Sequence, residues 1–144
     1  MNNIFLVAVD GSPGSKNAID FAAERANRGG EKIIVAYVIE WSPYSFNTPE
    51  ENAQRHKRRE EEIERATTTI VDPVAAELKE AGLDVETVVS HGNPSQTVVE
   101  LATSRDVAQI FIGRTGESGL KTMLFGSVVA NLVQTSTVPV TVVP

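Results

Sequence analysis

Five short apolar runs dominate the distribution of hydrophobic positions along the chain. The runs at residues 4–9 and 33–39 are almost continuously apolar. Such runs are typical of strands that are buried on both faces of a parallel sheet. The run at residues 85–89 alternates more with polar residues, so we expect this strand near an edge of the sheet. The last two predicted strands cover residues 109–112 and 138–143.

Helical patterns connect the first three runs. A helix is predicted over residues 16–28, with Ser15 as its N-cap and a glycine pair as its stop signal. A second and strongly charged helical pattern covers residues 50–81. Pro73 should kink or split this helix, and Asp72 is able to cap the second piece.

Two further helices flank the fourth run. Residues 91–94 are predicted to form a turn, in which Asn93 caps a helix that begins at Pro94. Ser127 opens the last helix. Its inward face is predicted to comprise Val128, Leu132 and Val133.

Strands and helices therefore alternate along the whole chain. This alternation is typical of a doubly wound α/β fold, a parallel sheet with helices on both faces. Pro139 removes one ladder donor from the last strand and so favours an edge position for it. The chain has 144 residues and no linker-like stretch, and we expect one domain over residues 1–144.

The charge balance narrows the classes of partner. The chain has 13 Lys and Arg against 19 Asp and Glu, a net charge of −6, which disfavours non-specific binding to nucleic acid or anionic membranes. The mixed charges at residues 55–62 favour a solvated helix face with ion pairs. No apolar run has the length of a membrane span, and residues 1–3 lack the basic start of a signal peptide. We therefore expect a cytoplasmic protein.

The glycine-rich loop at residues 113–127 is the main candidate for a binding site. Gly113 and Gly116 are followed after nine residues by Gly126 and Ser127. Glycines let backbone amides approach an anion closely, and Ser127 stands at a predicted helix N-terminus, which favours phosphate. The alternative is a turn glycine followed by a serine N-cap.

Other polar residues offer no catalytic set. Asp10, at the carboxyl end of the first strand, is a candidate for ribose or for a metal ion through water, or for capping the first helix. A catalytic His91 needs a partner within hydrogen-bond reach, and the neighbouring sequence offers none. His56 is expected in solvent, and Trp41 and Tyr44 are expected to pack on the core rather than to form an adenine wall. The absence of cysteine excludes thiolate chemistry and disulfides.

The chain resembles the universal stress protein family over essentially its full length. The matching segments are residues 7–12, 36–39, 92–94 and 138–143, and above all the Gly-x2-Gly-x9-Gly-Ser motif. In that family the glycine motif marks the ATP-binding branch. The resemblance implies a five-stranded sheet of order 3-2-1-4-5, of the adenine nucleotide alpha-hydrolase-like kind, and a homodimer joined through the C-terminal strand.

The resemblance also implies a set of nucleotide-binding residues. Asp10 and its neighbours would border the adenosine, Val38 would contact adenine through its main chain, and the glycine motif would hold ribose and phosphates. Arg114 stands where a serine is common and adds a positive charge near the phosphates. The full set is Ala8, Asp10, Ser12, Val38, Ile112, Gly113, Arg114, Gly116, Gly126, Ser127 and Val128.

The sequence therefore predicts an ATP-binding stress protein that acts as a nucleotide-dependent regulator or sensor, with ATP bound together with a divalent metal such as Mg²⁺. A protein partner, not identified by the sequence, would read the bound state. Two alternatives stay open. One is a dimeric interaction module with a vestigial nucleotide site, and the other is a slow ATPase or phosphotransferase.

Overall fold

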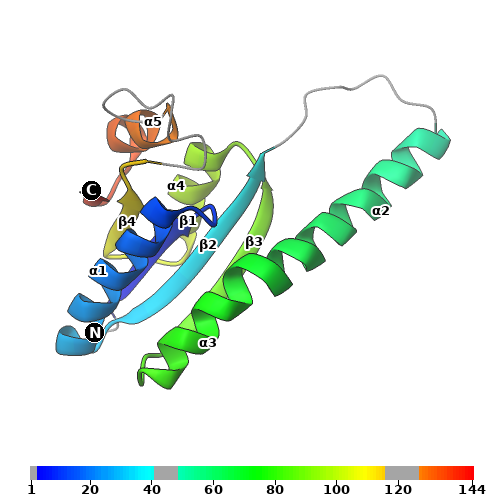
Figure 1. Ribbon diagram of the computed structural model, residues 1–144. Helices are drawn as coiled ribbons and strands as arrows, with labels where there is room; N and C mark the ends of the chain where they lie inside the picture. The colour runs from blue at the N-terminus through cyan, green and yellow to red at the C-terminus, as the bar shows by residue number, and fades with distance from the viewer. Residues whose placement is uncertain (1–2, 41–48, 116–126) are drawn as a thin grey trace.

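A five-stranded parallel sheet forms the centre of the computed structural model, which describes residues 3–40, 49–115 and 127–144. The strand order is β3-β2-β1-β4-β5, as predicted (Figure 1). The central strand β1 pairs with β2 on one side and with β4 on the other. The bounds are β1 Ile4–Val9, β2 Lys32–Glu40, β3 Val85–Gly92, β4 Gln109–Gly113 and β5 Val140–Val143.

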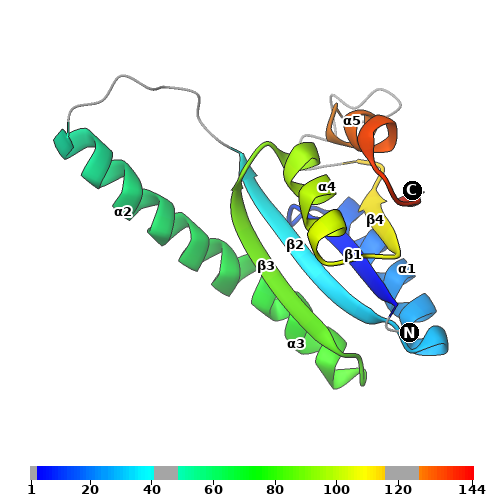
Figure 2. The ribbon, with the colours of Figure 1, turned by 180° about the vertical axis from the view of Figure 1, so that it is seen from behind.

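Helices cover both faces of the sheet (Figures 1 and 2). On one face, α1 (Pro13–Gly29) and α3 (Asp72–Glu80) pack on Val7, Val35 and Phe111. On the other face, α4 (Pro94–Ser104) and α5 (Ser127–Thr135) pack on the alternate strand positions, which include Leu6 and Ile110. Because successive strand residues point to opposite faces, each continuous apolar run supplies both cores.

The first helix begins earlier than predicted. Ser12, rather than Ser15, is the N-cap, because its Oγ accepts a hydrogen bond from the Ser15 backbone N–H at 3.2 Å. Pro13 occupies the first turn, where its fixed φ suits a helix and its missing N–H costs nothing. Gly30 ends the helix with a φ of 82°, a conformation that glycine adopts without steric cost.

The charged helical segment is not broken at Pro73. α2 (Pro49–Ala66) continues through a π-helical turn, Thr67–Val71, directly into α3. Pro73 lacks a backbone N–H, and the wider turn before it accommodates the missing hydrogen bond. The prediction that Asp72 caps a new helix is wrong, because its backbone is already helical, with φ −62° and ψ −42°. A side-chain cap acts only where a helix begins.

The third strand is longer than predicted, and its end is not a turn. β3 extends to Gly92 because β2 is long enough to pair with it there, and Ile39 lies opposite His91. Asn93 then caps α4 by accepting a hydrogen bond from the Gln96 N–H at 3.0 Å, as predicted. β3 and β5 form the two edges of the sheet, which confirms both edge predictions.

The C-terminal elements differ in detail from the prediction. Val129 and Leu132 are the buried residues of α5, whereas Val133 is 54% exposed, so its assignment to the inward face is wrong. β5 begins at Val140, after Pro139, which has no N–H to donate to the ladder. The described helices include none that is both long and apolar enough to span a bilayer.

Candidate functional site

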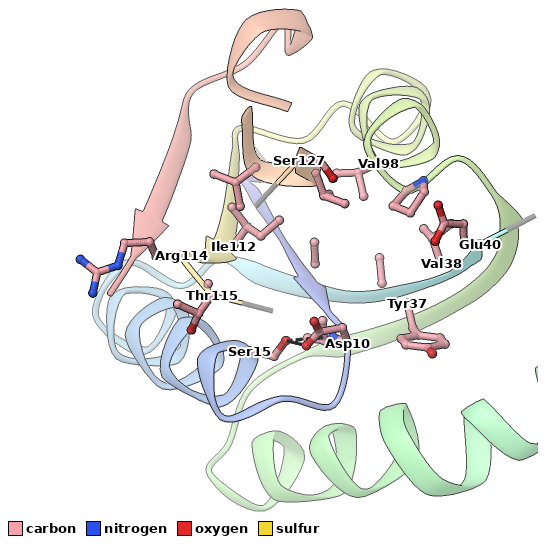
Figure 3. Close-up of a pocket in the computed structure, with 17 residues that line it drawn as sticks. Asp10, Ser15, Tyr37, Val38, Glu40, Val98, Ile112, Arg114, Thr115 and Ser127 are labelled. Carbon is pink, nitrogen blue, oxygen red and sulfur yellow. Dashed lines mark hydrogen bonds between the residues drawn. The ribbon is translucent and has the colours of Figure 1, made fainter. Parts of the chain in front are cut away.

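A cavity of about 520 Å³ lies at the carboxyl ends of β1, β2 and β4 (Figure 3). The chain runs outward from β1 through β2 to β3 and then crosses to β4 on the other side of β1. Ligands of doubly wound sheets bind at such a point of reversal, because the connecting helices leave the sheet on opposite faces there. Eight of the eleven predicted site residues line this cavity. They are Ala8, Asp10, Val38, Ile112, Gly113, Arg114, Ser127 and Val128.

One part of the cavity is apolar. Ala8 and Ala36 lie side by side on β1 and β2, and their short side chains leave room above the sheet. Val38, Val98 and Ile112 surround them with methyl groups (Figure 3). The faces of a flat ring that enters this part would be removed from water and would contact apolar side chains, which favours binding.

The polar part of the cavity contains Asp10, whose orientation is fixed by the first turn of α1. Asp10 Oδ1 accepts hydrogen bonds from the Ser15 hydroxyl at 2.6 Å and from the Ser12 N–H at 3.0 Å. The Ser15 Oγ in turn accepts from the Asp10 backbone N–H at 2.8 Å. Asp10 does not cap α1, because the N-cap is Ser12; its carboxylate instead binds the Ser12 N–H and the Ser15 hydroxyl. The same contacts hold the carboxylate at the cavity wall, where Figure 3 shows it beside Ser15.

Two glycines bring the loops after β1 and β4 into direct contact. A Cβ on Gly14 would overlap the carbonyl oxygen of Thr115, and a Cβ on Gly113 would overlap the carbonyl oxygen of Gly14. Only glycine permits this approach. The contact of Gly14 with Thr115 sets how far apart the two sides of the cavity stand.

Three predicted site residues are not among the described residues that line the cavity. Ser12 is buried and acts through its cap on α1. Gly116 and Gly126 lie outside the described residues. The guanidinium of Arg114 points away from the cavity in Figure 3, while its backbone N–H donates to the Val143 carbonyl at 2.7 Å.

The match to known proteins covers the whole chain. The model of the universal stress protein family matches residues 1–144. The chain belongs to this family. Universal stress protein YxiE of Bacillus subtilis is 29% identical over 150 residues, which cover 99% of each chain. Universal stress protein A homolog 1 of Coxiella burnetii is 32% identical over 123 residues, which cover 83% of this chain and 81% of that protein.

Solved universal stress protein structures share the fold. The structure of MJ0577, from Methanocaldococcus jannaschii, has a TM-score of 0.85 at 24% identity and covers 99% of this chain and 96% of its own. A universal stress protein solved in complex with cAMP has a TM-score of 0.71 at 26% identity, with coverage of 99% and 96%.

His91 has a partner that the sequence did not reveal. Its Nε2 lies 3.0 Å from Glu62 Oε2, and only 11% of the His91 side chain is exposed. The expectation that His91 has no partner is wrong, because α2 brings Glu62 to the end of β3 from 29 positions away. Neither residue is among those that line the cavity, so the pair ties α2 to the sheet edge. His56 pairs with Glu60 in solvent, in agreement with its predicted exposure.

Several residues of the cavity were not predicted from this universal stress protein sequence. Tyr37 and Glu40 come from the end of β2, Pro94 and Val98 from the start of α4, and Thr115 follows β4. Their common signal is position, since they lie near the carboxyl ends of strands or in the helix that follows one. In the described parts of the chain, no three His, Asp or Glu side chains gather where they could hold a metal ion.

The contact between the two loops leads to a stability prediction. Gly14→Ala should lower the free energy of unfolding by ~1–3 kcal/mol, because the added methyl must displace backbone atoms of Thr115. Gly29→Ala is the matched control. A Cβ there meets only the flexible carboxylate end of Glu31, and alanine favours the helix. Urea unfolding followed by circular dichroism measures both. Equal stability of the two variants would contradict a tight contact at Gly14.

Proposed function

We propose that this universal stress protein binds an adenine nucleotide, ATP in the first place, in the cavity at the carboxyl ends of β1, β2 and β4. The observation that carries the proposal is the division of this cavity into an apolar part and a polar part at the point where the strand order reverses. Its volume of about 520 Å³ lies within the roughly 300–1,000 Å³ of small-ligand sites. The relative at 26% identity was solved with cAMP, which carries the same base.

The proposed orientation of the nucleotide follows from the chemistry of the walls. Adenine would lie over Ala36 in the apolar part, in contact with the main chain of Val38. Asp10 would accept hydrogen bonds from the ribose hydroxyls, because its carboxylate is already held at the wall. The phosphates would extend toward Gly113 and toward Ser127, where α5 begins and its free N–H groups favour negative charge.

A magnesium ion is proposed to accompany ATP rather than to occupy a site built by the protein. Magnesium keeps several waters and is usually held by phosphate oxygens and one or two carboxylates. Asp10 is the carboxylate at the polar part of the cavity, so it fits the role of an outer partner that contacts the ion through water. The ion would neutralise charge on the phosphates.

The proposed role of binding is regulation through a change in conformational populations. A nucleotide that contacts the loops after β1 and β4 favours the conformation in which these loops are ordered, and a partner protein would read this conformation. The alternatives are an interaction module whose nucleotide site is vestigial and a slow ATPase. The described cavity wall contains no histidine, and the Asp10 carboxylate is hydrogen-bonded to the loop that carries it, which favours a binder over an enzyme.

Calorimetry with ATP, GTP and adenosine tests the proposed function. We expect ATP to bind at micromolar or lower concentration and GTP to bind more weakly. Acid release of nucleotide from the freshly purified protein, followed by chromatography, provides an independent check. Failure of ATP and adenosine to bind, together with the absence of any co-purified nucleotide, would favour the interaction module.

Bound ATP should be hydrolysed slowly, because neither carboxylate of the described cavity wall is placed to activate water at the phosphates. Asp10 is hydrogen-bonded to its own loop, and Glu40 lies beside Val38 at the part proposed for adenine (Figure 3). We expect fewer than about one turnover per second, below typical values for dedicated enzymes. Release of phosphate under saturating ATP and Mg²⁺ measures the rate. Faster steady turnover would favour the ATPase alternative.

The C-terminal strand is proposed to join two copies of the chain. β5 is short, β-branched and lies at an edge of the sheet, and unpaired edges tend to pair with another chain. Val140→Lys should convert a dimer into a monomer, because it places a charge on the partly buried edge strand. Light scattering at high ionic strength, which weakens any contact made by exposed charges, measures the mass. A monomeric wild-type protein, or a variant that stays dimeric, would contradict this interface.

A further inference from the structure

The helix α2 carries two adjacent blocks of opposite charge. Residues 55–59 contain four of the 13 Lys and Arg residues, and residues 60–64 contain four of the 19 Asp and Glu residues. Both blocks lie within α2, which spans Pro49–Ala66. A helix with this arrangement is complementary to a second copy of itself in the antiparallel direction, because reversal places each block opposite the other.

The relevant part of α2 extends away from the sheet. In both views, its N-terminal turns diverge from the sheet and reach past the end of β3 (Figures 1 and 2). Lys57, Arg58, Glu61 and Glu64 are all exposed. Gln54, Lys57, Arg58 and Glu61 line one shallow depression, so the basic and acidic residues share one face of the helix.

These four charges are not paired within the described residues. His56 and Glu60 form an ion pair at 3.0 Å with the i to i+4 spacing, whereas Lys57 and Glu61, at the same spacing, form none. Glu62 pairs with His91, which anchors the inner side of α2 to β3. The outer face therefore presents two cations and two anions that no described neighbour neutralises.

We propose that two copies of the chain associate through antiparallel pairing of their α2 helices about a two-fold axis at the level of Glu60. Lys57 and Arg58 lie three and two residues before this level, and Glu61 and Glu64 lie one and four residues after it. At 1.5 Å per residue, each basic pair then stands opposite the acidic pair of the other copy, within reach of these long side chains. The contact is isologous, so every ion pair occurs twice.

A second copy fits this face better than another type of partner. A nucleic acid or an acidic protein would match Lys57 and Arg58 but would be repelled by Glu61 and Glu64. Exposed ion pairs contribute only ~0–1 kcal/mol each, so the association is weak on its own and is weakened by salt. α2 packs beside β3, at the sheet edge opposite β5, so this contact leaves the proposed C-terminal interface free and joins its dimers into larger assemblies.

Sedimentation of the full-length protein with charge-reversed variants tests the proposal. At low ionic strength, Arg58→Glu alone and Glu61→Arg alone should each lower the mass by half or more, because like charges then face each other across the axis. An equimolar mixture of the two variants should restore the wild-type mass, since every cross-chain pair is again of opposite sign. Lys79→Glu, on the exposed side of α3, is the matched control and should change nothing.

The mixture distinguishes pairing between chains from ion pairing within one helix. A loss of mass caused within one helix by either substitution would persist on mixing, whereas a loss caused by like charges between chains would be reversed. Circular dichroism verifies that the variants keep their helices. Wild-type mass in both single variants would overturn the proposal, and so would a mixture that stays at the lower mass. High salt should lower the wild-type mass, and a mass insensitive to salt would also count against pairing by charge.

Discussion

Ala36→Ile is expected to weaken the binding of ATP and of adenosine alike, by about tenfold to a hundredfold or more. Ala36 is 1% exposed and lines the apolar part of the cavity next to Ala8. The larger side chain fills the space proposed for adenine, whereas a β-branched residue suits the strand. Calorimetry with both ligands measures the loss.

Val35→Ile is the matched control for this substitution. Val35 is the adjacent, fully buried residue of β2, and it points into the core under α1 and α3 on the opposite face of the sheet. The added methylene should cost stability without entering the cavity. If Ala36→Ile were folded and bound both ligands as tightly as the wild type, the base would not lie over Ala36.

Gly126→Val is expected to weaken the binding of ATP about tenfold to several-hundredfold and to affect the binding of adenosine much less. Gly126 lies outside the described residues, and the expectation follows from its place in the glycine motif directly before Ser127. A side chain there would keep backbone amides from the phosphates, and charge-assisted hydrogen bonds contribute roughly 1.5–3 kcal/mol each. The same calorimetric titrations, run on this variant, measure both affinities.

Ser127→Ala provides the comparison, because its backbone amide remains and only the hydroxyl is lost. Its effect on ATP should be smaller than that of Gly126→Val. Together with Ala36→Ile, the two variants separate the proposed base and phosphate parts of the site. Unchanged ATP affinity in a folded Gly126→Val protein would mean that the glycine serves the turn alone.

Local features of the sequence predicted most of the elements correctly. Short apolar runs identified all five strands, and Asn93 followed by Pro94 correctly marked the start of α4. These features succeed because the apolar pattern of a strand and the capping signal of a helix are both contained in residues close in sequence. One wrong detail arose because two nearby residues, Ser12 and Ser15, could each cap α1.

The sequence by itself determined the alternation of strands and helices, the edge positions of β3 and β5, and the gathering of polar and glycine residues at one edge of the sheet. The tertiary structure alone decided which distant residues meet. Gly14 touches Thr115 because β1 and β4 are neighbours, and Glu62 reaches His91 because α2 continues through the π-helical turn into α3 without a break. The physical reason is that a contact between distant residues depends on the packing of whole elements, which no local pattern of residues records.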